Sequence, residues 1–162
     1  MAKAIPIKPR TSGTNSVSSN KPIAIIASKF NKSYVDALIE SCVEELKDLL
    51  PSNLIHVVRV PGANEIPVTI KQMSFQDQDF GCYIALGLIL QGETQHGNLI
   101  SNSVSQALMN LSLDLTTPII NEVLHVENEQ QAQARCHGKE LNRGIEAARS
   151  AYSMMNVFNN LK

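Results

Sequence analysis

A short polar segment with the residue types of a catalytic loop follows the most apolar stretch of the sequence. The segment QGETQH (91–96) comes directly after YIALGLIL and before residues of helical periodicity. A glycine lets the backbone approach a ligand, and main-chain N–H groups at the start of a helix attract phosphate. A histidine one step further can move a proton near neutral pH. These residues predict an anion site beside an acid–base group, although an ordinary capping turn with a surface histidine has the same composition.

The elements that must position this loop alternate in type along the chain. Short apolar runs of β character alternate with amphipathic stretches of helical period, which is typical of a parallel α/β sheet. The runs that predict strands are residues 22–28, 53–60, 81–90 and 117–124. The stretches that predict helices are residues 33–50, 65–73, 100–115, 128–137 and 139–160. Asn31 or Ser33 is the expected cap of the first helix, and Gly138 is expected to separate the last two.

This alternation predicts one domain at residues 21–162. Its fold class is α/β, a single-domain three-layer sandwich with a four-stranded parallel sheet of the flavodoxin-like type. Residues 1–20 contain basic but no acidic side chains and lack the apolar core of a secretory signal. They predict a flexible or extended arm that pairs with a neighbouring chain, with an organelle transit peptide as the alternative.

Four loops of the predicted domain meet at one edge of its sheet. Ligands of open α/β folds bind at the carboxyl ends of the strands. The loops that follow the predicted strands are SKFN (28–31), PGANE (61–65), GETQH (92–96) and the turn around His125. The segment QGETQH therefore belongs to the edge of the sheet that is expected to carry the site.

Composition excludes several classes of partner. The formal net charge of −1 provides no basic field for nucleic acid and no polybasic surface for a membrane. The apolar runs are far shorter than the roughly twenty residues that a membrane-spanning helix requires. The three cysteines are widely spaced and include no Cys-x-x-Cys pair, which indicates a reduced, cytoplasmic protein without a metal site. Small molecules or proteins are the expected partners.

Four segments of the chain together resemble the lumazine synthase family. They are SKFN, VRVPGANEIP, ALGLILQGETQH and NEQQAQARCHGKELNRG, and the resemblance runs from about residue 22 to about residue 156. The resemblance implies a transferase that condenses 5-amino-6-ribitylamino-2,4-pyrimidinedione with 3,4-dihydroxy-2-butanone 4-phosphate. The products are 6,7-dimethyl-8-ribityllumazine, phosphate and water, in the penultimate step of riboflavin biosynthesis, and no metal or organic cofactor is implied.

The resemblance also implies how the protein assembles. Members of the family form homopentamers, and some form icosahedral capsids of twelve pentamers, with each site lying between two subunits. Riboflavin synthase is a further candidate partner. The sequence leaves open whether pentamers of this chain stay free, pair face to face or close into a capsid.

Residue by residue, the resemblance implies a set of substrate contacts. Phe30 would lie against the pyrimidine ring and Asn31 near the ribityl chain. Glu65 would accept hydrogen bonds from ribityl hydroxyls, although an acid in the first turn of a helix also complements the helix dipole. Further contacts, made mostly by the backbone, are implied for Ala63, Asn64, Leu88 and Ile89.

Phosphate binding and proton transfer are implied for a second set. The family's phosphate loop is matched by Gly92, Glu93 and Thr94. His96 matches its acid–base histidine. Arg135 falls on the phosphate-binding arginine that reaches the site from the adjoining subunit; taken by itself it would be a solvated helix charge. Lys139 and Arg143 match further basic positions nearby.

The chain departs from the common family pattern at three positions. Asn64, Gly97 and Asn121 stand where aromatic residues are usual, and Asn121 takes the place of the neighbour's ring that stacks on the pyrimidine. Stacking would then depend on Phe30 alone or include His125. A flavin- or pterin-binding module without catalysis fits these departures. A structural shell protein is a second alternative, because members of the family assemble into pentamers and capsids.

Overall fold

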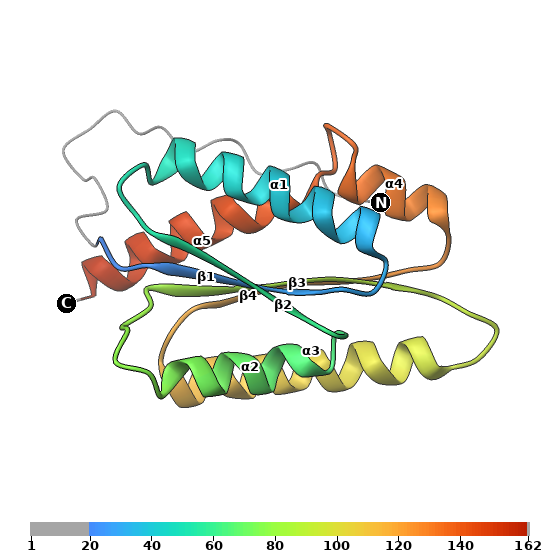
Figure 1. Cartoon of the computed structure of the whole chain (residues 1–162), viewed down its shortest axis with the longest axis horizontal. Coiled ribbons are helices and arrows are strands. Elements are labelled where there is room, and N and C mark those ends of the chain that lie inside the picture. Colours follow the sequence, from blue (N-terminus) through green and yellow to red (C-terminus); the bar gives the residue numbers. More distant parts are fainter. Residues whose placement is uncertain (1–19, 162) are drawn as a thin grey trace.

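Each apolar run of the sequence forms a strand of one parallel sheet. A computed structural model of the chain describes residues 20–161 (Figure 1). The strands are β1 (Ile23–Ser28), β2 (Ile55–Val60), β3 (Cys82–Leu90) and β4 (Ile119–Val126). They pair in parallel in the order β2-β1-β3-β4. The two central strands, β1 and β3, are the most apolar because both of their faces are covered.

Helices form the two outer layers (Figure 1). One face of the sheet is covered by α1 (Lys32–Leu49), α4 (Glu129–Cys136) and α5 (Arg143–Asn160). The other face is covered by α2 (Glu65–Ser74) and α3 (His96–Leu115). This arrangement confirms the predicted three-layer α/β sandwich of the flavodoxin-like type. The arm predicted at residues 1–20 lies outside the described residues except for Asn20.

Alternate residues of β1 enter two separate cores. Ile23 and Ile25 pack with residues of α1 and α5, whereas Ala24 and Ile26 pack with residues of α2 and α3. Burial of an isoleucine side chain stabilises a fold by about 1.5–3 kcal/mol. The two cores hold the sheet between its helical layers, and the loops at its carboxyl edge are fixed as a result.

The first helix has the predicted stripe but not the predicted cap. Its buried residues are Val35, Leu38, Cys42, Leu46 and Leu49. Asn31 precedes α1 in a left-handed conformation, with φ 51°, and its side chain makes no capping hydrogen bond. Ser33 already lies within the helix. Asn31 therefore stands at the predicted N-cap position without a side-chain cap, and its amide nitrogen donates instead to Leu88 of the neighbouring strand β3.

The last two helices begin and end differently from the prediction. Gly138 does lie between them, and glycine is needed there because a Cβ at this position would lie 2.2 Å from the Ala134 carbonyl oxygen. The final helix begins at Arg143 and not at residue 139. Its cap is Asn142, whose side chain accepts from the Ile145 N–H at 3.1 Å and donates to the Cys136 carbonyl at 3.2 Å. Those two bonds keep residues 139–142 out of the helix.

The strand at the other edge of the site begins and ends two residues later than predicted. β4 ends at Val126, so His125 lies within the strand and not in a turn after it. It stands opposite Ile89 in the register between β4 and β3. Among the described residues, no helix is long and apolar enough to cross a membrane.

Candidate active site

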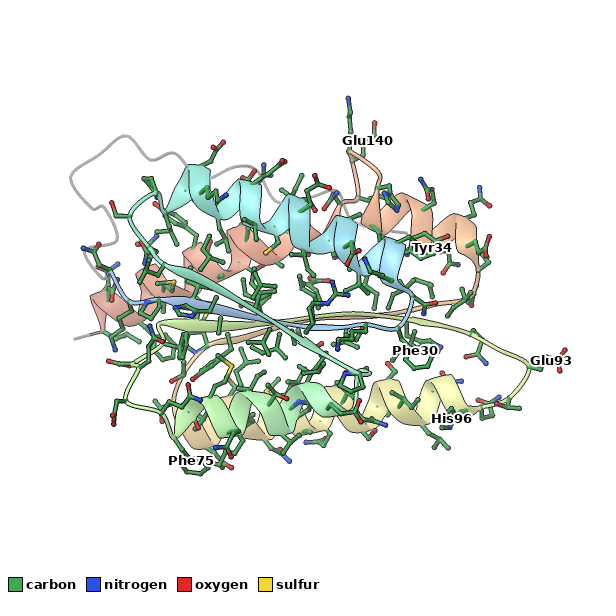
Figure 2. The ribbon with its side chains drawn as sticks, in the orientation of Figure 1. Phe30, Tyr34, Phe75, Glu93, His96 and Glu140 are labelled. Atoms are coloured by element: carbon green, nitrogen blue, oxygen red, sulfur yellow. The ribbon has the colours of Figure 1, made fainter. Side chains whose placement is uncertain are left out.

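The carboxyl edge of the sheet carries a cavity of ≈ 430 Å³. Its walls come from the loops after β1, β2 and β3, where open α/β folds bind their ligands. Most of the residues predicted to contact substrate line it: Phe30, Asn31, Ala63, Asn64, Glu65, Leu88, Ile89 and His96. Figure 2 shows Phe30 and His96 on the same side of the sheet, with Glu93 at the tip of the neighbouring loop. Other hollows of the described surface, including one of ≈ 600 Å³ beside β2 and α2, lie away from these three loops.

The loop after β1 presents an aromatic ring at the cavity. The side chain of Phe30 is 73% exposed, so one face of the ring is free to stack on a planar ligand. Asn31 holds the loop against β3, because its side-chain amide donates to the Leu88 carbonyl at 2.8 Å. The left-handed backbone of Asn31 and this bond together determine where Phe30 projects.

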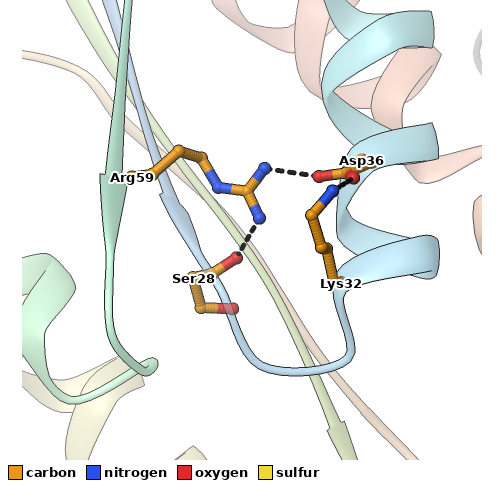
Figure 3. A network of polar contacts seen from close by, with 4 residues as sticks. All are labelled: Ser28, Lys32, Asp36 and Arg59. Carbon is orange, nitrogen blue, oxygen red and sulfur yellow. Dashed lines mark hydrogen bonds and ion pairs between the residues drawn. The ribbon is translucent and has the colours of Figure 1, made fainter.

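A network of charges fastens the same loop from its outer side (Figure 3). Arg59 of β2 donates to the Ser28 carbonyl at 2.9 Å and forms an ion pair with Asp36 of α1. Lys32 also pairs with Asp36. Hydrogen bonds from Lys32 and Arg59 hold the pKa of the Asp36 carboxyl below its usual value. β2, the end of β1 and the start of α1 are thereby tied together around the loop that carries Phe30.

The loop after β2 brings a carboxylate to the cavity. Glu65 is the first residue of α2, and its Oε2 accepts from the Gly62 N–H at 2.7 Å. A Cβ at Gly62 would lie 3.0 Å from this oxygen and 4.0 Å from the Phe30 ring. Glycine therefore leaves room for the carboxylate and the aromatic ring to come close together. The second carboxylate oxygen, Oε1, has no hydrogen-bond partner among the described residues and can accept from a ligand.

The loop after β3 lies beside the cavity and is exposed. Gly92, Glu93 and Thr94 do not line the cavity, whereas His96 opens α3 and does. A Cβ at Gly92 would meet no atom within 4 Å. Nothing within the described chain therefore requires glycine there, and the open space next to it is available to a ligand or to another chain.

Four of the predicted residues lie away from the cavity within one chain. Asn121 is exposed on β4 and donates to the Ser105 hydroxyl of α3 at 3.2 Å. Arg135 donates to the carbonyl of Gln131, one turn earlier in α4, at 3.3 Å. Lys139 lies in the connection after α4, and Arg143 pairs with Glu146 at the start of α5. Both helices cover the face of the sheet opposite His96 (Figure 1).

Some notable residues were not identified from the sequence. Ser28 ends β1 with a buried hydroxyl that lines the cavity and has no hydrogen-bond partner among the described residues. The signal was its place as the only polar residue of an otherwise apolar strand. Glu122 of β4 faces α5 on the other side of the sheet, where burial raises the pKa of its carboxyl to about 7, with Arg143 opposing the rise and Glu146 adding to it.

Within residues 20–161, no group of three or more His, Cys, Asp or Glu residues is placed to hold a metal ion. The groups that meet at the cavity are an aromatic ring, an amide, a carboxylate and an imidazole. An open parallel sheet with such a cavity at its carboxyl edge defines an α/β protein of flavodoxin-like fold with a site for a small polar ligand.

Comparison with known proteins identifies the family. Residues 20–159 match the family model described as 6,7-dimethyl-8-ribityllumazine synthase. The chain is 42% identical over 147 residues to the 6,7-dimethyl-8-ribityllumazine synthase of Methylibium petroleiphilum, covering 90% of this chain and 88% of that protein. It is 38% identical over 136 residues to the enzyme of that name from Azoarcus sp., covering 83% and 84%. The chain belongs to the 6,7-dimethyl-8-ribityllumazine synthase family, which confirms the resemblance found in its four segments.

Proposed function

We propose that this chain condenses 5-amino-6-ribitylamino-2,4-pyrimidinedione with 3,4-dihydroxy-2-butanone 4-phosphate to give 6,7-dimethyl-8-ribityllumazine, phosphate and water. The observation that carries the proposal is the cavity at the carboxyl edge of a family member. There, three loops bring Phe30, Glu65 and His96 together. The reaction is the penultimate step of riboflavin biosynthesis and needs no metal or organic cofactor.

The pyrimidine substrate binds along the walls from the first two loops. Phe30 stacks on the heterocycle with its exposed face, and Glu65 accepts hydrogen bonds from the ribityl hydroxyls. Asn31 contributes its amide oxygen, since its amide nitrogen already donates to Leu88. Backbone groups of Ala63, Asn64, Leu88 and Ile89 complete the contacts. Their place in the wall of the cavity supports these assignments.

Proton transfer is assigned to His96. The amine of the pyrimidine attacks the ketone, and water leaves to form an imine. Phosphate is then eliminated, and the second nitrogen attacks the remaining carbonyl group and closes the ring with loss of a second water. Each step moves protons between nitrogen, carbon and oxygen. An imidazole in the wall of the cavity is suited to accept and return them at neutral pH.

The phosphate is assigned to Gly92, Glu93 and Thr94 together with a cation from another chain. Within one chain Arg135 lies on α4, in the layer opposite α3, which supports its assignment to the site of a second copy. Members of the family form oligomers, and we propose a homopentamer, or an assembly of pentamers such as an icosahedral capsid, with sites between subunits. Lys139 and Arg143 would follow Arg135 to the neighbour's site, and Asn121 would face the neighbour's pyrimidine.

Two further proposals concern the cellular compartment and a partner protein. All three cysteines are buried and unpaired, which supports a reducing compartment, the cytoplasm. Riboflavin synthase is proposed as a partner on the family resemblance alone.

An absorbance assay tests the proposed reaction. Purified protein is mixed with both substrates, and formation of the lumazine is followed against the same mixture without protein. We expect turnover above the uncatalysed rate that requires both substrates. A folded, oligomeric preparation that binds a lumazine or flavin without accelerating the reaction would favour the non-catalytic binding module. One that assembles into particles and neither binds nor reacts would favour the shell protein.

A further inference from the structure

Gln91 joins the loop after β3 to the neighbouring strand. Its backbone N–H donates to the Val126 carbonyl at 2.8 Å, which extends the pairing of β3 with β4. Its side-chain nitrogen donates to the Gly92 carbonyl at 2.9 Å and to the Thr94 carbonyl at 2.8 Å. Its side-chain oxygen lies 2.8 Å from Nε2 of His125. One side chain therefore contacts both ends of the loop and a strand at the edge of the sheet.

These contacts determine which atom carries the proton. The amide nitrogen of Gln91 gives its two hydrogens to two carbonyl oxygens, so its Oε1 can only accept. His125 must then donate from Nε2, as a neutral ring protonated at that atom or as a cation. The hydrogen bond between the two side chains, called here the Gln91–His125 bridge, is thus present in both charge states.

Gly97 provides the space that the bridge occupies. A Cβ at this position would lie 3.2 Å from Oε1 of Gln91 and 3.2 Å from Nε2 of His125. The backbone of Gly97 lies in the first turn of α3 and outside the left-handed region, so glycine relieves crowding against the two side-chain ends and is not needed for backbone conformation. An aromatic side chain here, as is usual in the family, would displace the bridge. The bridge therefore lies in the space that the usual aromatic side chain at position 97 would fill.

The bridge also orients donors of the loop. In a trans peptide the C=O group and the N–H group of the next residue point in opposite directions. Because Gln91 holds the carbonyls of Gly92 and Thr94, the N–H groups of Glu93 and Gln95 point away from it. Neither N–H has an acceptor among the described residues. Two unpaired N–H groups on a loop before a helix form the arrangement that binds an anion.

We propose that Gln91 and His125 are positioning residues that hold the phosphate loop in its binding conformation. They act through the loop backbone and do not touch the substrate. This inference rests on the proposed function, because it assigns the loop's ligand as the phosphate of the four-carbon substrate. The bridge replaces the packing that an aromatic residue at position 97 would supply.

The test compares three substitutions with a matched control. Gln91→Met removes all three side-chain bonds at similar length, and His125→Leu removes only the bridge. His125→Gln keeps an N–H donor at about the reach of Nε2. Gln76→Met is the control, because Gln76 is exposed at the opposite end of the sheet. For each variant, the dissociation constant of inorganic phosphate is measured by titration, and KM is measured for both substrates.

Gln91→Met should raise the phosphate dissociation constant and the KM of the four-carbon substrate about tenfold, with the KM of the pyrimidine changed less than twofold. His125→Leu should give a smaller rise of about threefold to tenfold, and His125→Gln should recover most of it. The double variant should bind phosphate no more weakly than Gln91→Met alone, because both changes remove the same bond. Gln76→Met should match the wild type.

Additive effects, equal changes in both KM values, or unchanged phosphate binding in Gln91→Met would overturn the inference. Thermal unfolding of each variant checks that the fold is retained. Failure of the proposed function is recognised separately, since the wild type would then show no turnover, whereas the phosphate titration still reports on the bridge.

Discussion

At the scale of single residues, the side chains around the cavity differ in how firmly they are held. Asn31 and Glu65 are fixed by hydrogen bonds to the backbone at 2.8 and 2.7 Å. The ring of Phe30 has no hydrogen-bonding group, the imidazole of His96 makes no hydrogen bond within the described chain, and both side chains line the cavity. The hydrogen-bonded groups are suited to orienting the ribityl chain, and the Phe30 ring and the His96 imidazole are suited to stacking and proton transfer.

His96→Ala should separate binding from chemistry. General acid–base catalysis is typically worth about 10²–10⁴-fold. The two substrates condense slowly without an enzyme, so we expect kcat to fall by roughly tenfold to a few hundredfold, at the low end of that range. The variant should still fold and bind the lumazine product, as measured by fluorescence titration. Unchanged kcat would make His96 a structural residue of the loop.

At the scale of elements, Arg59 joins β2 to the start of α1 through its contacts with Ser28 and Asp36. Arg59→Met should free the loop that carries Phe30 and raise the KM of the pyrimidine severalfold, with little change for the phosphate substrate. Lys32→Met is the matched control, because it removes the more exposed partner of Asp36, and exposed pairs contribute roughly 0–1 kcal/mol. Equal effects of the two variants would refute this role for Arg59.

The contribution of the Asp36 ion pairs to stability is expected to be lost at acidic pH. The pKa of Asp36 is lowered in the folded state, so its contribution to stability is complete above the pKa of the unfolded chain, about 4. This contribution is lost as the pH falls through the lowered value in the folded protein. The difference in unfolding free energy between wild type and Arg59→Met should therefore shrink below about pH 4. A difference that is constant from pH 7 to pH 3 would contradict the assignment.

Glu122, which lies between β4 and α5, lowers the stability of the fold as the pH rises, in contrast to Asp36. Its pKa is raised from 4.5 to about 7, so ionisation opposes folding, and its presence costs stability as the pH rises from 4.5 towards 7. Glu122→Gln should have little effect at pH 4.5 and should increase the unfolding free energy by about 2–3 kcal/mol at pH 8. Urea denaturation at the two pH values measures this. An equal increase in unfolding free energy at pH 4.5 and pH 8 would show that the pKa of the Glu122 carboxyl is not raised in the folded protein.

At the scale of the whole molecule, periodicity predicted the order and type of the elements. The apolar runs became strands, and the stripe of α1 has the predicted spacing, because burial on one or two faces leaves a repeating mark in the sequence. The cap at Asn142, the use of Asn31 by β3 and the Gln91–His125 bridge could not be predicted. Their partners are distant in sequence or depend on how a strand lies beside its neighbour, as for Gln91 and His125, 34 positions apart.

In the candidate site, too, some features could be predicted from the sequence and others could not. Phe30, Glu65 and His96 come from loops that parallel strands must bring to one edge, so their meeting follows from the topology. The side of the sheet on which Arg135 lies depends on the connection after β4 and on α4, which no pattern of apolar residues determines. Its position opposite His96 in one chain is the reason why the proposed role of Arg135 involves a second chain.

Hybrid oligomers test the central claim, that this chain makes the lumazine at a site shared between two copies. Arg135→Ala and Glu65→Ala chains, each nearly inactive alone, are unfolded, mixed in equal amounts and refolded together. In a closed ring about one interface in four then joins an intact Glu65 to an intact Arg135. We predict that lumazine formation recovers to about a quarter of the wild-type rate. No recovery in oligomers shown by mass spectrometry to contain both chains would contradict the account.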